Sequence, residues 1–282
     1  MTDPIPGSTA SLAEGSADFA WDGHALEKGI GLALSGGGFR AMLFHAGALV
    51  RLNELGLLAK VQRISSVSGG SIAAGYLSLI WKKLGAPHGG SYPQFKEDYV
   101  EEILAFSRQS IDVTDALTGL LPWTSAAEQV AASYDKALFH GTTLQGLPDQ
   151  PQFIFCSTNL QTAVNFRFSK PYAGDYVVGR VANPDLPLST AVTASSAFPP
   201  FLSPLVLTLP AGSFTDWPGQ PAGAGGVMDP VPFRSKILLT DGGVYDNHGL
   251  EPVLVPRRSS CRGGHRPRRF RIPVGDRAQH PE

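Results

Sequence analysis

The sequence predicts an α/β protein with a mostly parallel central sheet. The prediction depends on one pattern that occurs twice: an apolar run leads into glycines and then into a helical pattern at residues 29–56, and again at residues 61–85. Two such strand, glycine turn and helix units in series are typical of parallel strands joined by crossover helices. The chain has 282 residues, of which 43% are apolar, and this suits one such domain with an insertion.

Each unit is justified by its local pattern. The first begins with "GIGLALS" at residues 29–35, passes through three glycines and continues at helical spacing until about Gly56. The second begins with the β-prone "VQRISSVS" at residues 61–68, turns at two glycines and continues as an apolar helix that ends near Gly85. Both turns therefore follow the carboxyl end of a predicted strand.

Residues 86–150 break this alternation, and we interpret them as a mainly helical insert. Apolar side chains at spacings of four, four and three residues predict an amphipathic helix with an acidic outer face; they are Phe95, Tyr99, Ile103 and Phe106. A second apolar group contains Leu120, Leu121 and Trp123. The insert could form a lid or an acyl-chain groove, but packing of most of these side chains onto the domain is the favoured interpretation.

Strand patterns resume after the insert. "QFIFCSTNL" at residues 152–160 and "AVNFRFS" at residues 163–169 predict adjacent strands. "LSTAVTASSAFPPF" at residues 188–201 predicts a short helix that the two prolines end. Residues 211–232, rich in Gly and Pro, predict a long surface loop. "SKILLT" then predicts a last strand directly before Asp241.

The two ends of the chain differ from the domain between them at residues 29–252. Residues 1–28 form a polar leader that we expect to be poorly ordered; they lack the apolar core of a signal peptide, and no apolar run of the chain reaches about 18 residues. We therefore expect a cytoplasmic protein, or one exported without a classical signal. Residues 253–282 hold eight of the fifteen arginines without any periodicity. They fit a basic arm for anionic membranes or, as we favour, the end of a truncated or frameshifted reading frame.

The composition argues against several classes of function. A net charge of −1 gives no basis for nucleic-acid binding through bulk electrostatics. Cys156 and Cys261 belong to no Cys-x-x-Cys or Cys/His cluster, so neither a disulfide framework nor a metal site is expected. A reducing compartment is favoured.

The stretch "RISSVSGGSIAAGYL" at residues 63–77 contains the candidate nucleophile. A serine hydroxyl becomes reactive at a sharp strand-to-helix turn, close to a base and to oxyanion donors. Such a turn requires small residues two positions before and after the serine. Ser68 satisfies this requirement, with Ser66 before it and Gly70 after it, whereas Ser71 is expected to cap the helix. An ordinary polar turn is the alternative.

The glycines after the first strand supply candidate oxyanion donors. Gly36, Gly37 and Gly38 place backbone N–H groups at a helix N-terminus, where the helix dipole favours negative charge. Gly36, Gly38 and Ala41 also satisfy the G-x-G-x-x-A pattern of a dinucleotide-binding loop, but no acid follows about 20 residues later at a strand end, so a nucleotide-binding enzyme is a distant alternative. His45, on the following helix, is expected to be structural.

Asp241 is the candidate base. It ends the last predicted strand and precedes Gly242 and Gly243, so we expect its carboxylate at the carboxyl edge of the sheet, where parallel α/β proteins have their sites. A carboxylate there could take the proton of a serine directly. The alternatives are an ordinary turn, or a Ser-Asp-His triad for which His248 or His265 is the best placed histidine.

Together and in this order, GGGFR, S-x-S-G-G and DGG resemble the motifs of the patatin-like phospholipase family, namely Gly-Gly-Gly-x-Arg/Lys, G-x-S-x-G and Asp-Gly-Gly/Ala. The resemblance runs from about Gly29 to Pro252, and about 30 residues separate the first two motifs. Arg40 matches the basic residue of the first motif. Ser66 replaces the first glycine of the second, and Ala41 replaces a glycine that often follows the basic residue; both substitutes are small.

The resemblance implies a three-layer α/β/α fold and a lipid acyl hydrolase of phospholipase A or lysophospholipase type that uses neither metal nor cofactor. Carried over by position, Ser68 is the nucleophile, Asp241 the base, and residues 36–38 form the oxyanion hole. The substrates would be phospholipids or other acyl-ester lipids, met in transient contact with a membrane surface. A non-catalytic or defective chain that acts as a binding module is the main alternative.

Overall fold

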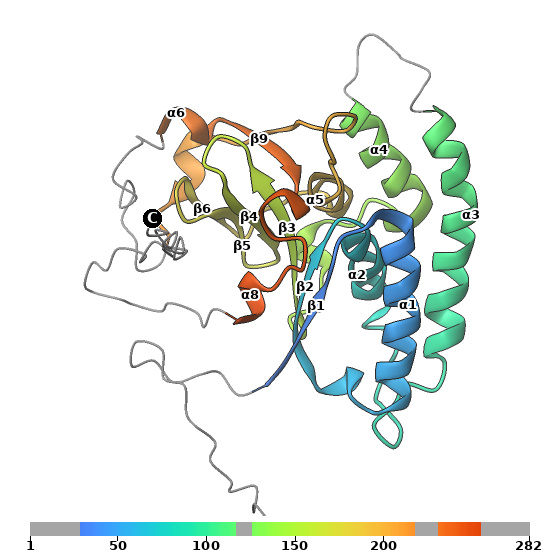
Figure 1. Ribbon diagram of the computed structural model, residues 1–282. Coiled ribbons are helices and arrows are strands. Elements are labelled where there is room, and N and C mark those ends of the chain that lie inside the picture. The colour runs from blue at the N-terminus through green and yellow to red at the C-terminus, as the bar shows by residue number, and fades with distance from the viewer. Residues whose placement is uncertain (1–28, 117–125, 218–230, 255–282) are drawn as a thin grey trace, which may run out of the picture.

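The computed structural model describes residues 29–116, 126–217 and 231–254 (Figure 1). One sheet separates a thick layer of helices from a thin one. The predictions for the leader, for the arginine-rich segment after residue 254 and for Leu120, Leu121 and Trp123 lie outside the described residues.

The nine-stranded sheet is mixed. Its first two strand pairs, β1 with β2 and β2 with β3, are parallel, as the repeated pattern predicts, and its other pairs are antiparallel. β8 occupies residues that we predicted as loop, and β5, β6 and β7 are short strands that we did not predict. The strands are β1 (Ile30–Leu34), β2 (Val61–Val67), β3 (Gln152–Asn159), β4 (Val164–Ser169), β5 (Tyr172–Asp175), β6 (Gly179–Ala182), β7 (Leu205–Thr208), β8 (Phe214–Thr215) and β9 (Lys236–Asp241).

β2 and β9 approach each other along one edge of β3. β2 pairs in parallel with β3 until Val67 lies opposite Cys156, and β9 pairs antiparallel with the continuation of β3, with Asp241 opposite Ser157. The carboxyl ends of β2 and β9 therefore face each other. This corrects the expectation that Asp241 lies on a parallel strand: the two strand ends meet because β3 extends beyond the end of β2.

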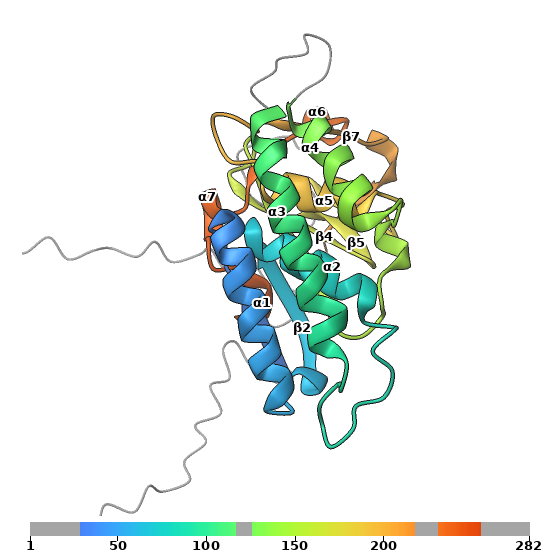
Figure 2. The same ribbon diagram turned by 90° about the vertical axis from the view of Figure 1, so that its right-hand side faces the viewer.

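Most helices cover one face of the sheet (Figures 1 and 2). The large core lies on this face, while Val67, Ile154 and Cys156 form a small separate cluster on the other. There Val253 of α8 packs against Gly31 of β1. The α/β/α layers are thus present but unequal. The helices are α1 (Gly38–Glu54), α2 (Gly69–Ile80), α3 (Glu101–Ala116), α4 (Ala126–Tyr134), α5 (Leu188–Ser195), α6 (Val231–Arg234), α7 (Gly243–Asp246) and α8 (Glu251–Leu254), with 3-10 turns at Leu58–Lys60, Leu144–Gly146 and Ala211–Ser213 and π turns at Lys96–Val100 and Asp135–Phe139.

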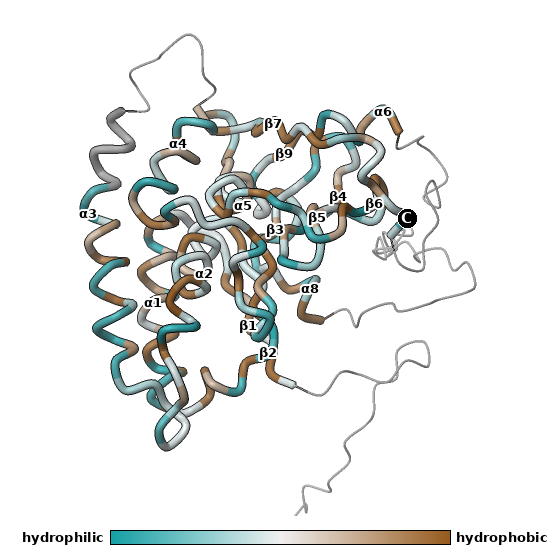
Figure 3. Tube along the Cα trace, turned by 180° about the vertical axis from the view of Figure 1, so that it is seen from behind, coloured by the Kyte–Doolittle hydropathy of each residue, from teal (hydrophilic) through white to brown (hydrophobic). Residues whose placement is uncertain are grey.

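The described part of the insert packs on this helical layer. Along α3, polar and apolar segments alternate (Figure 3), as expected of an amphipathic helix. The four predicted apolar positions from Phe95 to Phe106 are buried, and the hydroxyl of Tyr99 donates a 2.8 Å hydrogen bond to the carbonyl of Ala73 in α2. These side chains therefore attach the insert to the domain. Among the described helices, none is long and apolar enough to span a membrane.

Candidate active site

Ser68 lies at a sharp turn between β2 and α2. Its backbone has φ 52° and ψ −122°, outside the regions that residues with a Cβ normally occupy. Such a conformation costs on the order of 1–3 kcal/mol and persists where the surrounding structure enforces it. The residue is only 8% exposed. The strand-to-helix turn predicted at Ser68 is therefore present.

The glycine loop before α1 packs closely against this turn. A Cβ on Gly70 would lie 2.7 Å from the carbonyl oxygen of Ser35, and a Cβ on Gly69 would collide with the backbone carbonyl of Gly38. Real Cβ atoms do not approach backbone oxygens so closely. Glycine at both positions therefore allows the loop and the turn to meet.

Two of the three predicted oxyanion donors have amides available to a ligand. Gly37 has φ 140° and Gly38 has φ 63°, which favour glycine, and neither amide donates to any residue that the structure describes. The amide of Gly36 differs, since it donates a 2.9 Å hydrogen bond to the carbonyl of Asn247. The amide of Gly69, at the start of α2, likewise has no acceptor within the described ranges, and no sequence motif identified it as a candidate donor.

His45 and Arg40 follow the loop on α1. Nε2 of His45 lies 2.9 Å from the carbonyl oxygen of Ser35 and 3.3 Å from its hydroxyl, so the imidazole anchors the start of the loop. Burial lowers the pKa of His45, and the hydrogen bond to Ser35 opposes this effect. A neutral, hydrogen-bonded ring fits the structural role that we expected. Arg40 is exposed in the first turn of α1.

Asp241 ends β9, and the side chain of Ser68 lies close enough to lower its pKa. Its carboxylate also accepts a 2.7 Å hydrogen bond from the amide of Gly243, and the residue is 7% exposed. Burial raises the pKa of Asp241 above its ordinary value of 3.8, against the smaller opposing effects of the Gly243 amide and the Ser68 side chain. A Cβ on Gly243 would lie 3.0 Å from the carboxylate, and one on Gly242 would lie 3.0 Å from the carbonyl carbon of Cys156. Both glycines thus leave room at the end of β9.

Ser195, at the end of α5, contacts both halves of the site, and no sequence pattern singled it out. Its carbonyl accepts hydrogen bonds from the amides of Ser68 and Gly242, at 3.2 Å and 3.1 Å. Its hydroxyl lies 2.8 Å from that of Ser71, which donates to the hydroxyl of Ser66 over 2.9 Å. Ser71 therefore does not cap α2, and this corrects the prediction. Ser66 is fully buried in the same network.

No described histidine completes a triad with Ser68 and Asp241. Neither side chain has a hydrogen bond to a histidine in the described part of the chain. His248 is exposed on the turn after α7, and its amide donates to Asp246, while His265 lies outside the described residues. The arrangement is therefore a serine and carboxylate pair.

Apolar side chains are exposed on the segment that follows Ala197. Phe198 and Phe201 are 48% and 72% exposed, and their rings lie 5.7 Å apart. They follow Ala197, whose carbonyl accepts a 2.8 Å hydrogen bond from the amide of Asp241. Exposed aromatic rings next to a candidate site suit an apolar ligand.

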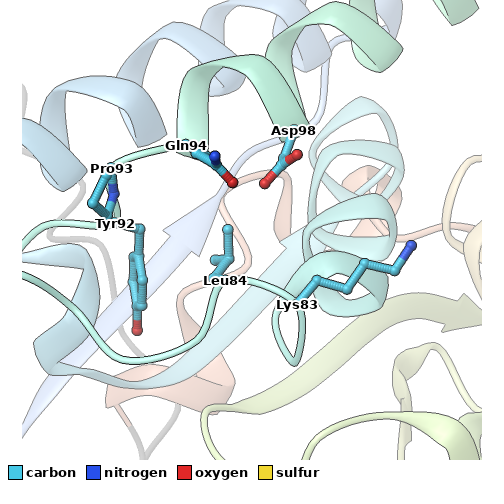
Figure 4. A pocket seen from close by; sticks show the side chains of 6 residues that line it. All are labelled: Lys83, Leu84, Tyr92, Pro93, Gln94 and Asp98. Atoms are coloured by element: carbon cyan, nitrogen blue, oxygen red, sulfur yellow. The ribbon is translucent and has the colours of Figure 1, made fainter.

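A separate hollow of about 240 Å³ lies at the other end of α2 (Figure 4). Lys83 of its lining follows the carboxyl end of α2, whereas Ser68 precedes the amino end, and twelve helical residues span about 18 Å. This hollow is therefore not part of the candidate site. Its lining residues are Lys83, Leu84, Tyr92, Pro93, Gln94 and Asp98.

Comparisons with known proteins give one family. The family model described as "Patatin-like phospholipase" matches residues 32–254. Among solved structures, human GIVD cytosolic phospholipase A2 is similar at 17% sequence identity with a TM-score of 0.44, over 81% of this chain and 44% of that chain. The chain thus spans less than half the length of that protein. No curated protein matches it.

Proposed function

Since the chain belongs to the patatin-like phospholipase family, we propose that it is a lipid acyl hydrolase that cleaves carboxylic esters of phospholipids or related lipids. In this proposal Ser68 is the nucleophile, Asp241 is its general base, and backbone amides of the glycine loop stabilise the oxyanion. The observation that carries the proposal is the meeting of β2 and β9 along β3, which brings the two residues so close that the side chain of Ser68 lowers the pKa of Asp241.

The first half of the reaction acylates the serine. Asp241 accepts the hydroxyl proton while Oγ of Ser68 attacks the ester carbonyl. The oxyanion of the tetrahedral intermediate accepts hydrogen bonds from the amides of Gly37 and Gly38, beside that of Gly69; in characterised hydrolases the loss of one such donor costs about 3–4 kcal/mol. As the intermediate collapses, the carboxyl returns the proton to the departing alcohol.

The second half repeats these steps with water. Water gives a proton to Asp241 and attacks the acyl ester, and Ser68 recovers its proton as the fatty acid leaves. Burial supports this role, because a carboxylate whose pKa is raised is a stronger base. The sequence of steps requires neither a metal nor a cofactor.

The exposed rings of Phe198 and Phe201 support a lipid rather than a small soluble ester as the substrate. They present apolar surface within a few residues of the segment that holds Asp241. Burial of apolar surface yields about 25 cal/mol per Å², so contact with acyl chains would favour binding. The proposal therefore includes transient contact with a membrane surface.

Hydrolysis of phospholipid vesicles tests the proposal. We expect the wild type to release fatty acid and Ser68→Ala to release none above background. Ser78→Ala is the matched control, because Ser78 is, like Ser68, a buried serine, but its hydroxyl donates to the carbonyl of Gly75 within α2. A folded wild type that binds vesicles without hydrolysing any ester would favour the alternative, a non-catalytic binding module.

A further inference from the structure

Ser195 joins the two candidate catalytic residues through its backbone. Its carbonyl oxygen accepts the amide of Ser68 at 3.2 Å and the amide of Gly242 at 3.1 Å. The first amide belongs to the candidate nucleophile, and the second directly follows Asp241. One atom therefore fixes the ends of β2 and β9 relative to each other.

The hydroxyl of Ser195 adds a second contact to the same amide. Its Oγ accepts a 3.0 Å hydrogen bond from the amide of Ser68 and donates a 2.6 Å hydrogen bond to the carbonyl of Cys156 in β3. The residue is fully buried, so water does not compete for these contacts. The hydroxyl thus connects the turn at Ser68 to the strand that both halves of the site share.

The carbonyls of two residues close to Ser195 also accept hydrogen bonds from the strands of the site. The carbonyl of Ala197 accepts the amide of Asp241 at 2.8 Å and the hydroxyl of Thr240 at 3.0 Å. The carbonyl of Ala194 accepts the hydroxyl of Ser157 at 3.0 Å. The end of α5 and the two residues after it are therefore hydrogen-bonded to β3, to β9 and to the turn after β2.

Ser68 requires such restraint because of its backbone conformation. A residue with a Cβ and positive φ relaxes toward a commoner conformation unless its surroundings hold it. The amide of Ser68 precedes the first residue of α2, so the hydrogen bonds of the helix do not include it. Without the Ser195 hydroxyl, only the longer 3.2 Å contact to the carbonyl would remain.

We propose that Ser195 is a positioning residue that holds Ser68 in place beside Asp241 for proton transfer. The inference depends on the proposed hydrolase function and deepens it. Ser195 acts through Ser68 and the chain after Asp241, not on the substrate. Its removal therefore affects the proton transfer and leaves substrate binding intact.

The test compares Ser195→Ala with Thr193→Val on a soluble ester. Thr193 is a buried residue of the same helix whose hydroxyl has no hydrogen-bond partner within the described ranges, so it controls for loss of a hydroxyl from α5. We expect Ser195→Ala to lower kcat by about 10- to 100-fold, because small displacements of reacting groups have effects of this size, and to change KM by less than about twofold. Thr193→Val should keep the wild-type values.

The pH profile separates positioning from a general loss of structure. The side chain of Ser68 lowers the pKa of Asp241, so its displacement should move the acid limb of kcat/KM to higher pH in Ser195→Ala alone. If Ser195→Ala does not fold, Ser71→Ala removes a hydroxyl that contacts Ser195, and we expect a smaller shift in the same direction.

The results of these assays separate the positioning role of Ser195 from the hydrolase function. An active wild type with unchanged kcat and acid limb in Ser195→Ala, or with equal losses in Thr193→Val, overturns the positioning role and leaves the hydrolase function standing. The same holds for Ser71→Ala if it is the variant used. A folded wild type without any esterase activity overturns the proposed function and this inference with it.

Discussion

Replacement of Asp241 by asparagine should stabilise the fold while it strongly lowers activity. Burial raises the pKa of Asp241 above 3.8, so ionisation of this carboxyl is more costly in the folded chain than in the unfolded chain. The stability that the protonated Asp241 carboxyl contributes is fully present below its pKa in the unfolded chain. It is lost as the pH rises through the pKa in the folded chain. Asparagine stays neutral, and it keeps an oxygen for the amide of Gly243 and an N–H group for Ser68.

The size of the effect follows from the pKa. Each unit by which the folded-state pKa exceeds its ordinary value makes the wild type about 1.4 kcal/mol less stable at neutral pH than a neutral group would. In a domain of this size, 1 kcal/mol corresponds to about 2–4 °C in Tm. Asp241→Asn should therefore melt above the wild type at neutral pH, and its activity should fall by about 10²- to 10⁴-fold, the usual contribution of a general base.

Thermal melting monitored by circular dichroism, between about pH 4 and about pH 8, measures the predicted difference, which should shrink toward acid pH. Asp185→Asn, at an exposed acid, is the control and should show no such dependence. A lower Tm for Asp241→Asn at neutral pH, or a difference that does not vary with pH, would refute the argument that burial dominates at this carboxyl. The same argument predicts that wild-type kcat/KM falls on the acid side with a midpoint above 3.8, because only ionised Asp241 accepts the proton.

Three further changes test other parts of the structure. In Gly70→Ala the new Cβ would lie 2.7 Å from the carbonyl oxygen of Ser35. Overpacking of this kind should lower activity at least about tenfold and reduce the free energy of unfolding by about 1–3 kcal/mol. Wild-type activity in this variant would contradict the close packing. Phe201→Ser should slow the hydrolysis of vesicles but not that of a soluble ester. Leu55 is also an exposed apolar residue, and Leu55→Ser should affect neither rate. Equal rates for Phe201→Ser and the wild type on vesicles would refute the apolar contact. Tyr99→Phe loses a buried hydrogen bond and should reduce the free energy of unfolding in urea by about 1 kcal/mol, with activity unchanged.

Those parts of the fold that depend on local patterns were predictable. β1, β2, α1 and α2 follow from apolar runs, glycines and helical periodicity, which are properties of neighbouring residues. The strained turn at Ser68 was predictable for the same reason, since Ser66 and Gly70 are small. Similarly, the apolar spacing around Tyr99 identified side chains that are buried in the structure.

The missed features depend on contacts between segments far apart in the sequence. The antiparallel approach of β9 requires β3 to extend past β2, and no pattern around Asp241 encodes the direction of pairing. The amide of Gly36 is occupied by a carbonyl more than two hundred residues away, at Asn247. Ser195 looked like any serine at a helix end, because its role lies in backbone and hydroxyl contacts to two other segments.

The measurement that tests the central claim most directly is covalent labelling by a fluorophosphonate probe, with the labelled residue located by peptide fragmentation and mass spectrometry. We predict one adduct on Ser68 in the wild type, none in Ser68→Ala and much slower labelling in Asp241→Asn, with all three proteins folded. An adduct on Ser65, Ser66 or Ser71 instead, or a folded wild type that does not react, would contradict the assignment of Ser68 and Asp241 as the catalytic pair.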